Sequence, residues 1–134
     1  MTYAYLDSSA AVKLIVEEEC SAELTQWIAE TDPEFVSCDL LRVELLRACR
    51  QHSPEALAAA RDRLDAVTLL PMSTDLCQRA ADIDPAVLRS LDALHLAAAL
   101  SLGDDLSVVV TYDDRFAEAC RLYGVKVLAP EQSR

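Results

Sequence analysis

Four acidic residues of this chain stand at positions where a carboxylate could do chemistry. Asp92 lies in the almost wholly apolar run 91–100, Glu44 falls on the apolar stripe of another helical segment, and Asp7 and Asp113 follow strand-like runs. A buried carboxylate costs several kcal/mol unless a cation or a donor meets it. Gathered carboxylates repel one another, and a hard divalent cation such as Mg²⁺ removes that repulsion. Such an ion lowers the pKa of a bound water and stabilises charge on a phosphodiester.

Each acid also has a simpler explanation. Asp7 and Asp113 suit helix N-caps, and Asp92, in a first turn, complements the helix dipole. For any one of these acids taken alone, the simpler explanation is the stronger one. The functional interpretation rests on the coincidence of all four acids at element starts or on inward faces.

Glu44 is the hardest of the four to explain as an ordinary surface charge. It falls within the apolar stripe of residues 40–49, where a helix would turn it inward. An ion pair with Arg47, three residues on, or with Arg42 would account for it cheaply. Both the ion pair and a role in a site remain open from the sequence.

The elements that must position these acids alternate along the chain between short strand-like and longer helical runs. This alternation favours an α/β layer fold with a mostly parallel sheet, whose ligand site lies beyond the carboxyl ends of the strands. Strands are expected at 2–6, 35–38, 67–70, 107–111 and 126–128. The first helix is expected to start at 7–9 and continue through 10–16, and further helices are expected at 21–31, 39–50, 54–65, 73–83, 91–100 and 113–122.

Length and composition are those of a compact, helix-rich protein. A chain of 134 residues, 52% hydrophobic and 26% charged, fits one domain spanning 1–134. No apolar run approaches the roughly 20 residues that cross a bilayer, and the N-terminus does not resemble a secretion signal. Five cysteines without a C-x-x-C pair predict reduced thiols in the cytoplasm. Four of them are expected in the core: Cys38, Cys49, Cys77 and Cys120.

The formal net charge of −11 constrains the partners. An acidic surface repels nucleic acid and attracts cations or basic peptides. Any nucleic acid must therefore be held by local arginines and bound cations, against the overall field. A basic protein partner is favoured.

Several segments, taken in order, carry a resemblance to a known family. They are YLDSSAAVKL, Glu44 in its helix, LDALHLAAAL, VVVTYDDRFAEAC and GVKVLAP. Together they resemble a PIN domain and, more narrowly, the VapC toxins of bacterial toxin–antitoxin pairs. The resemblance runs from the first strand to the last, and LDALHLA is its most telling part. It implies a three-layer α/β/α fold and a Mg²⁺-dependent endoribonuclease inhibited by a VapB-type antitoxin.

The resemblance also assigns roles to individual residues. Asp7, Glu44, Asp92 and Asp113 match the four acids of the family. Asp7 and Asp92 are expected to bind Mg²⁺ directly, with Mn²⁺ as an alternative. Glu44 and Asp113 are then left to hold waters of that ion or a second ion. The resemblance further implies that water attacks the RNA phosphodiester in line, without a covalent enzyme intermediate, and that the protein is a homodimer.

Further residues are expected beside these acids. Those expected to support them or to bind substrate are Ser9, Thr111, Asp114, Arg89 and Arg115. Asp114 replaces Asp113 as the fourth acid if the turn is shifted by one residue. The two arginines suit contacts with phosphate, and equally suit surface ion pairs. His95 is expected to pack or to support the site rather than to catalyse.

Other classes fit the sequence less well. A non-catalytic receiver-like signalling domain needs an aspartate after a central strand, but the strand at 67–70 ends in Pro71, and Lys126 precedes its strand residue Val127. A haloacid dehalogenase-type phosphatase needs D-x-D, and Ser9 occupies the second position. A PIN fold used only as a binding scaffold would not be expected to keep all four acids.

Overall fold

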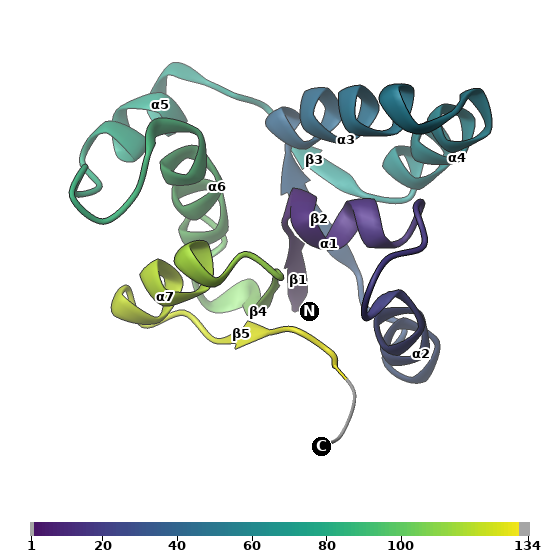
Figure 1. Cartoon of the computed structure of the whole chain (residues 1–134). Coiled ribbons are helices and arrows are strands. Elements are labelled where there is room, and N and C mark those ends of the chain that lie inside the picture. Colours follow the sequence, from purple (N-terminus) through teal and green to yellow (C-terminus); the bar gives the residue numbers. More distant parts are fainter. Residues whose placement is uncertain (1, 132–134) are drawn as a thin grey trace.

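The computed structural model describes residues 2–131, in which five strands form one sheet. Every strand pair is parallel, and the order across the sheet is β3-β2-β1-β4-β5 (Figure 1). The strands are β1 (Tyr3–Leu6), β2 (Phe35–Cys38), β3 (Thr68–Leu70), β4 (Leu106–Val110) and β5 (Val127–Leu128). The predicted parallel sheet is confirmed, with strand bounds within one residue of those expected.

Helices cover both faces of this sheet, which confirms the three-layer α/β/α fold. The α1–α4 helices lie against one face and α5–α7 against the other (Figure 1). The helices are α1 (Ser8–Lys13), α2 (Ser21–Thr31), α3 (Asp39–His52), α4 (Pro54–Asp65), α5 (Thr74–Ala81), α6 (Ser90–Leu100) and α7 (Asp114–Leu122), with a 3-10 turn at Gly103–Asp105.

Successive side chains of the central strands belong alternately to two hydrophobic cores, one on each face of the sheet. Tyr5 and Val109 belong to the cluster beneath α5–α7, whereas Leu6 and Val110 belong to the cluster beneath α1–α4. Because side chains of a strand point alternately to its two faces, a sheet covered on both sides needs apolar residues at every position. This requirement explains the unbroken Val108–Val110 run that predicted β4.

The helix starts follow from capping side chains. Ser53 accepts a hydrogen bond from the backbone of Ala56 at 3.0 Å, with Pro54 at the first helical position, and Ser73 caps α5 in the same way. Such caps stabilise a helix by about 1 kcal/mol. The first helix begins at Ser8, within the start expected at 7–9, because Asp7 serves as its N-cap, and it ends at Lys13 rather than at residue 16.

The direction of chain winding reverses at β1. From β1 the chain moves outward to β2 and β3, then crosses to β4 on the other side of β1 and ends at β5. Ligand sites of open parallel sheets form at such a reversal, beyond the strands' carboxyl ends. The order also differs from the 2-1-3-4-5 order of receiver domains, so the receiver alternative is wrong.

Three predicted core cysteines are buried and one is not. Cys38, Cys49 and Cys120 are buried free thiols, but Cys77 is exposed. Its prediction was wrong because α5 turns a different stripe, carrying Leu76, toward the core. None of the helices between residues 2 and 131 is long and apolar enough to cross a membrane.

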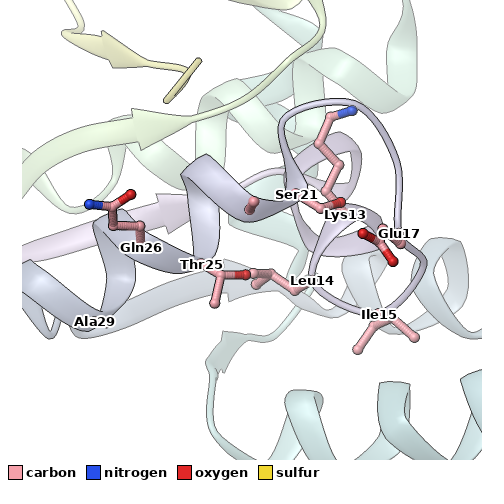
Figure 2. A pocket seen from close by; sticks show the side chains of 9 residues that line it. Lys13, Leu14, Ile15, Glu17, Ser21, Thr25, Gln26 and Ala29 are labelled. Atoms are coloured by element: carbon pink, nitrogen blue, oxygen red, sulfur yellow. The ribbon is translucent and has the colours of Figure 1, made fainter. Parts of the chain in front are cut away.

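A surface hollow of about 490 Å³ lies beside α1 and α2 (Figure 2). Lys13 and Glu17 contribute charge to its lining, and the remaining lining side chains are polar or apolar without charge. None of the four predicted acids lines this hollow, so the candidate chemistry lies elsewhere.

Candidate active site

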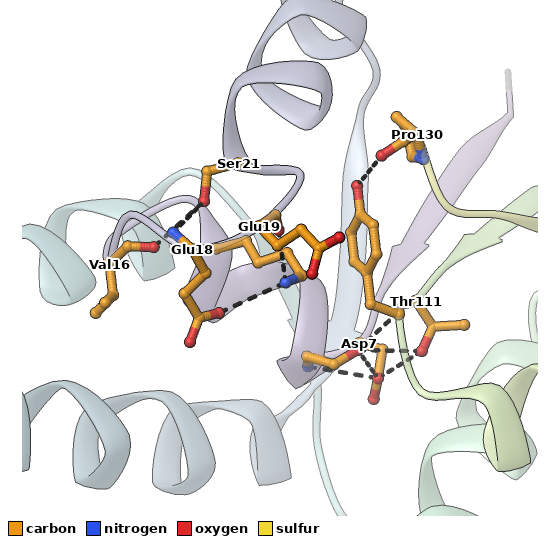
Figure 3. Close-up of polar contacts among 10 residues, drawn as sticks. Asp7, Val16, Glu18, Glu19, Ser21, Thr111 and Pro130 are labelled. Atoms are coloured by element: carbon orange, nitrogen blue, oxygen red, sulfur yellow. Dashed lines mark hydrogen bonds and ion pairs between the residues drawn. The ribbon is translucent and has the colours of Figure 1, made fainter. Parts of the chain in front are cut away.

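Asp7 is a buried acid held by two hydroxyl groups. It follows β1 directly, and only 4% of its surface is exposed. Its Oδ2 accepts hydrogen bonds from Ser9 Oγ at 2.7 Å and from Thr111 Oγ1 at 2.8 Å (Figure 3 shows Asp7 and Thr111). The backbone N–H of Ser9 lies 3.4 Å from the same oxygen. The carboxylate is therefore fixed in one orientation.

The same hydroxyls tie the end of β1 to the turn after β4. Register pairs Leu6 with Val110, so Asp7 and Thr111 leave the sheet side by side. Thr111 Oγ1 accepts from the backbone N–H of Asp113 at 3.1 Å, and Ser9 Oγ accepts from that of Tyr112 at 2.9 Å. The two sheet-end acids are thus connected through Thr111.

Asp113 and Asp114 occupy different environments. Asp113 is the half-buried N-cap of α7, and its Oδ1 accepts from the backbone N–H groups of Arg115 and Phe116 at 3.0 and 3.1 Å. Both bonds use one carboxylate oxygen. Asp114 is the first residue of α7 and is exposed. Capping therefore explains Asp113 in part, as its simpler interpretation anticipated.

The pKa of Asp92 depends on the charges of the other three acids. It is half-buried in the first turn of α6. Burial raises its pKa, and the negative charges of Asp113, Asp7 and Glu44 raise it further, while the charge of His95 opposes the rise. The charges of the three other predicted acids, which are far apart in the sequence, therefore all reach Asp92.

Glu44 bonds to a histidine from the opposite helix layer. Its Oε1 lies 2.6 Å from Nε2 of His95, whose other ring nitrogen lies 2.7 Å from the hydroxyl of Tyr5. The expected partners of Glu44 were Arg42 or Arg47. Instead, Arg42 lies 4.0 Å from Asp39, and the histidine is the partner of Glu44.

His95 is completely buried beneath this edge. Burial lowers its pKa, but hydrogen bonds with Cys38 and Glu44 outweigh burial and raise the pKa to about 10. The prediction that His95 packs against or supports the acids agrees with this placement. The sequence analysis missed Tyr5, although strand alternation from Leu6 would have turned its side chain toward the α6 layer.

Arg89 and Arg115 are exposed beside these acids. Arg89 is the N-cap residue of α6, three residues before Asp92, and Arg115 follows Asp114 in the first turn of α7. Neither arginine forms a salt bridge with another residue in the part of the chain that the structure describes.

The donors at this edge fit a hard cation. They are carboxylate and hydroxyl oxygens, which suit Mg²⁺ or Mn²⁺. Across residues 2–131, no group of three or more Asp, Glu, His or Cys side chains is placed to hold a metal ion. Mg²⁺ does not need such a group, because it keeps several waters and takes only one or two carboxylates directly. The residues present therefore fit this ion better than zinc, which prefers a closed set of thiolate and imidazole ligands.

Solved structures share the fold. A toxin–antitoxin complex from Klebsiella pneumoniae matches with a TM-score of 0.73 and 17% identity, covering 97% of this chain and 99% of that chain. VapC20 from Mycobacterium tuberculosis, described as a sarcin-ricin loop cleaving toxin, matches with a TM-score of 0.71 and 19% identity, covering 87% of this chain and 94% of that chain. The family model described as PIN domain matches residues 4–122. The match over residues 4–122 identifies the chain as a PIN domain, and the solved structures share its fold.

Relatives with similar sequences show which family of PIN-domain proteins this chain belongs to. Ribonuclease VapC46 of Mycobacterium tuberculosis (strain ATCC 25618 / H37Rv) is 41% identical over 130 residues, which is 97% of this chain and 99% of the relative. Ribonuclease VapC47 of the same species (strain CDC 1551 / Oshkosh) is 38% identical, over 94% of this chain and 96% of the relative. The chain belongs to the VapC family of PIN-domain proteins.

Proposed function

We propose that this protein is a Mg²⁺-dependent endoribonuclease toxin that hydrolyses RNA phosphodiester bonds and is inhibited by a VapB-type antitoxin. The names of its relatives, ribonucleases of the VapC family, support the reaction class. One observation of the structure carries the proposal. Asp7 and Asp113 are joined through Thr111 at the edge where the sheet order reverses, and the contact with His95 ties Glu44 to α6, the helix that carries Asp92.

In this proposal Asp7 and Asp92 bind Mg²⁺, for which Mn²⁺ can substitute. The bound cation supplies a water of lowered pKa and offsets the charge that develops on the phosphate. Asp7 would hold the ion with its carboxylate in one orientation, because Ser9 and Thr111 fix its Oδ2. Glu44 and Asp113 would accept hydrogen bonds from the water that attacks the phosphodiester in line, without a covalent enzyme intermediate.

Substrate binding has to overcome the charge of the protein. With a net charge of −11, RNA is repelled at long range. Arg89 and Arg115 are exposed next to the acids, and we assign them to the phosphates that flank the scissile bond. A guanidinium binds phosphate in a bidentate way, so two such contacts set register without reading sequence.

The same charge favours a basic inhibitor. An antitoxin arginine placed among the four carboxylates would compete with the cation for them. Structural neighbours include a toxin–antitoxin complex and a DNA-bound VapBC from Salmonella typhimurium, the latter with a TM-score of 0.74. We also propose a homodimer in a reducing cytoplasm, which sedimentation and thiol titration would test.

Cleavage of purified cellular RNA with and without Mg²⁺ tests the activity. Asp7→Asn and Asp92→Asn are expected to lose more than the roughly 100-fold that loss of a group supporting a metal ligand costs. Asp113→Asn keeps the cap of α7, since asparagine caps as well as aspartate, but it removes the charge. Any loss of cleavage in this variant therefore comes from the charge and not from the cap. Asp114→Asn is the matched control, and it should cut at the parent rate because Asp114 is exposed.

Two results would overturn the assignment. Cleavage that persists at full rate in a chelator excludes the metal role. Parent-level cleavage by Asp7→Asn or Asp92→Asn removes that residue from the site. If Asp114→Asn is inactive and Asp113→Asn is not, the fourth acid is Asp114.

A further inference from the structure

We propose that His95 is a positioning residue that holds the carboxylate of Glu44 through its Nε2–H, and that the Tyr5 hydroxyl fixes the orientation of the imidazole. The inference rests on the proposed function, because it concerns how one of the four acids is held.

The hydrogen-bond chemistry fixes which atom donates. An ionised carboxylate only accepts hydrogen bonds, so the 2.6 Å contact between Glu44 Oε1 and His95 Nε2 requires the hydrogen on Nε2. The other ring nitrogen, Nδ1, lies 2.7 Å from the Tyr5 hydroxyl, which can either donate or accept. Tyr5 therefore satisfies Nδ1, and the Nε2–H contact with Glu44 is the same in either case.

The ring is clamped as well as bonded. It meets the Tyr5 ring edge-on at a centroid distance of 5.8 Å and 77°, and the Phe116 ring at 6.3 Å and 70°. His95 is completely buried, so its ring has no freedom to swing outward. Both nitrogens are occupied, which leaves His95 unable to bind a metal in this arrangement.

Glu44 needs such a clamp because of where it comes from. It projects from α3, on one face of the sheet, whereas Asp92 and His95 belong to α6 on the other (Figure 1). Its side chain is 28% exposed, and a long carboxylate at that exposure is free to turn toward water. The bond to His95 spans the two layers and ties Glu44 to the helix that carries Asp92.

Several acidic groups surround the imidazole. Glu44 faces the imidazole from α3. Cys38 faces it from β2, with its Sγ 3.7 Å from Nδ1, and the charge of Asp7 also acts on the ring. Each of these groups favours a donor at this place. A carboxylate or a neutral acceptor substituted here would push Glu44 away.

Two amide substitutions separate positioning from packing. Glutamine places its NH₂ near the position of Nε2, and asparagine places its NH₂ near that of Nδ1. We expect His95→Gln to keep kcat within a few-fold of the parent. We expect His95→Asn to lower kcat by up to about 100-fold, the cost of misplacing a group at the reacting centre by about 1 Å, with the KM for RNA unchanged. Equal losses in both variants would show that only ring packing matters and would overturn the proposal.

A nitrogen-15 NMR measurement on the histidine side chains tests the hydrogen bond without any activity. His52, exposed at the end of α3, is the internal reference. The Nε2–H of His95 should be observed as a slowly exchanging proton that Glu44→Ala shifts and exposes to exchange. Glu44→Gln, which keeps an acceptor oxygen, should leave it protected. An unprotonated Nε2 in the parent would refute the assignment.

The two proposals fail in distinguishable ways. A parent protein that cuts no RNA while showing the protected Nε2–H would end the proposed function and leave the bond standing. If His95→Asn does not fold, Tyr5→Phe, which removes only the hydroxyl, takes its place. A parent-like kcat and an unchanged Nε2–H signal in Tyr5→Phe would refute the role of Tyr5.

Discussion

Thr111→Val removes one hydroxyl from the buried edge while keeping the shape of the side chain. The Thr111 side chain is 1% exposed, donates to Asp7 Oδ2 at 2.8 Å and accepts from the backbone N–H of Asp113 at 3.1 Å. Valine fills the same volume, so no cavity forms. The loss therefore measures hydrogen bonding alone.

The magnitude follows from those two contacts. A hydrogen bond to a charged group contributes about 1.5–3 kcal/mol and a neutral one about 1 kcal/mol. We expect the free energy of unfolding to fall by about 2.5–4 kcal/mol, out of the roughly 5–15 kcal/mol that a small domain has. Asp7 keeps the bond from Ser9. The Mg²⁺ concentration for half-maximal cleavage should therefore rise by roughly 10–100-fold rather than activity being abolished.

Urea unfolding and a Mg²⁺ titration of cleavage measure the two effects. Ser53→Ala is the control, since it deletes the cap bond to Ala56 and costs about 1 kcal/mol at a helix start outside the site. It should lower stability without moving the Mg²⁺ midpoint. The reasoning is refuted if Thr111→Val costs under about 0.5 kcal/mol, or if its Mg²⁺ midpoint matches that of Ser53→Ala.

Three further predictions concern charge and exposure. Burial and neighbouring acids raise the pKa of Asp92 in the fold, so its contribution to stability is lost as pH rises through that pKa. At neutral pH, Asp92→Asn should therefore raise the free energy of unfolding in urea by up to about 1 kcal/mol. A lower free energy of unfolding in the variant would contradict the shift. The pKa of His95 is raised from 6.5 to about 10, so its stabilisation is complete below pH 6.5 and lost as pH rises through about 10. His95→Gln should lack this part of the fall in stability with rising pH. A pH profile of stability identical to that of the parent would contradict the raised pKa of His95. Cys77 is exposed while Cys38 and Cys120 are buried, so Cys77→Ser should remove a fast phase of thiol labelling, and its persistence would place that reactivity elsewhere.

The sequence indicated the layers well because periodicity is a local property. Alternation of short apolar runs with amphipathic helices predicted every strand of the described chain, and the apolar run 91–100 predicted the buried α6. Strand order was out of reach, because it depends on which elements pack together. Cys77 was misplaced for a related reason, since a short helix offers two stripes and packing selects one.

The acids could be nominated from the sequence, but their partners could not. Glu44 and His95 are 51 positions apart and belong to opposite helix layers, so the nearby arginines were the only visible partners. The choice between Asp113 and Asp114 turns on a single residue at the start of α7, which only the cap geometry distinguishes. Local patterns thus named the candidates, and long-range packing decided their surroundings.

The order in which the chain supplies the site has a consequence during synthesis. Asp7 leaves the ribosome early, but Thr111 and Asp113 follow β4, whose insertion beside β1 comes near the end of translation. A nascent chain stopped before residue 106 lacks the fourth acid and the Thr111 hydroxyl, one of the two that hold Asp7. Under the proposed function, the ribosome that makes this protein is exposed to an active nuclease only once nearly the whole polypeptide has emerged.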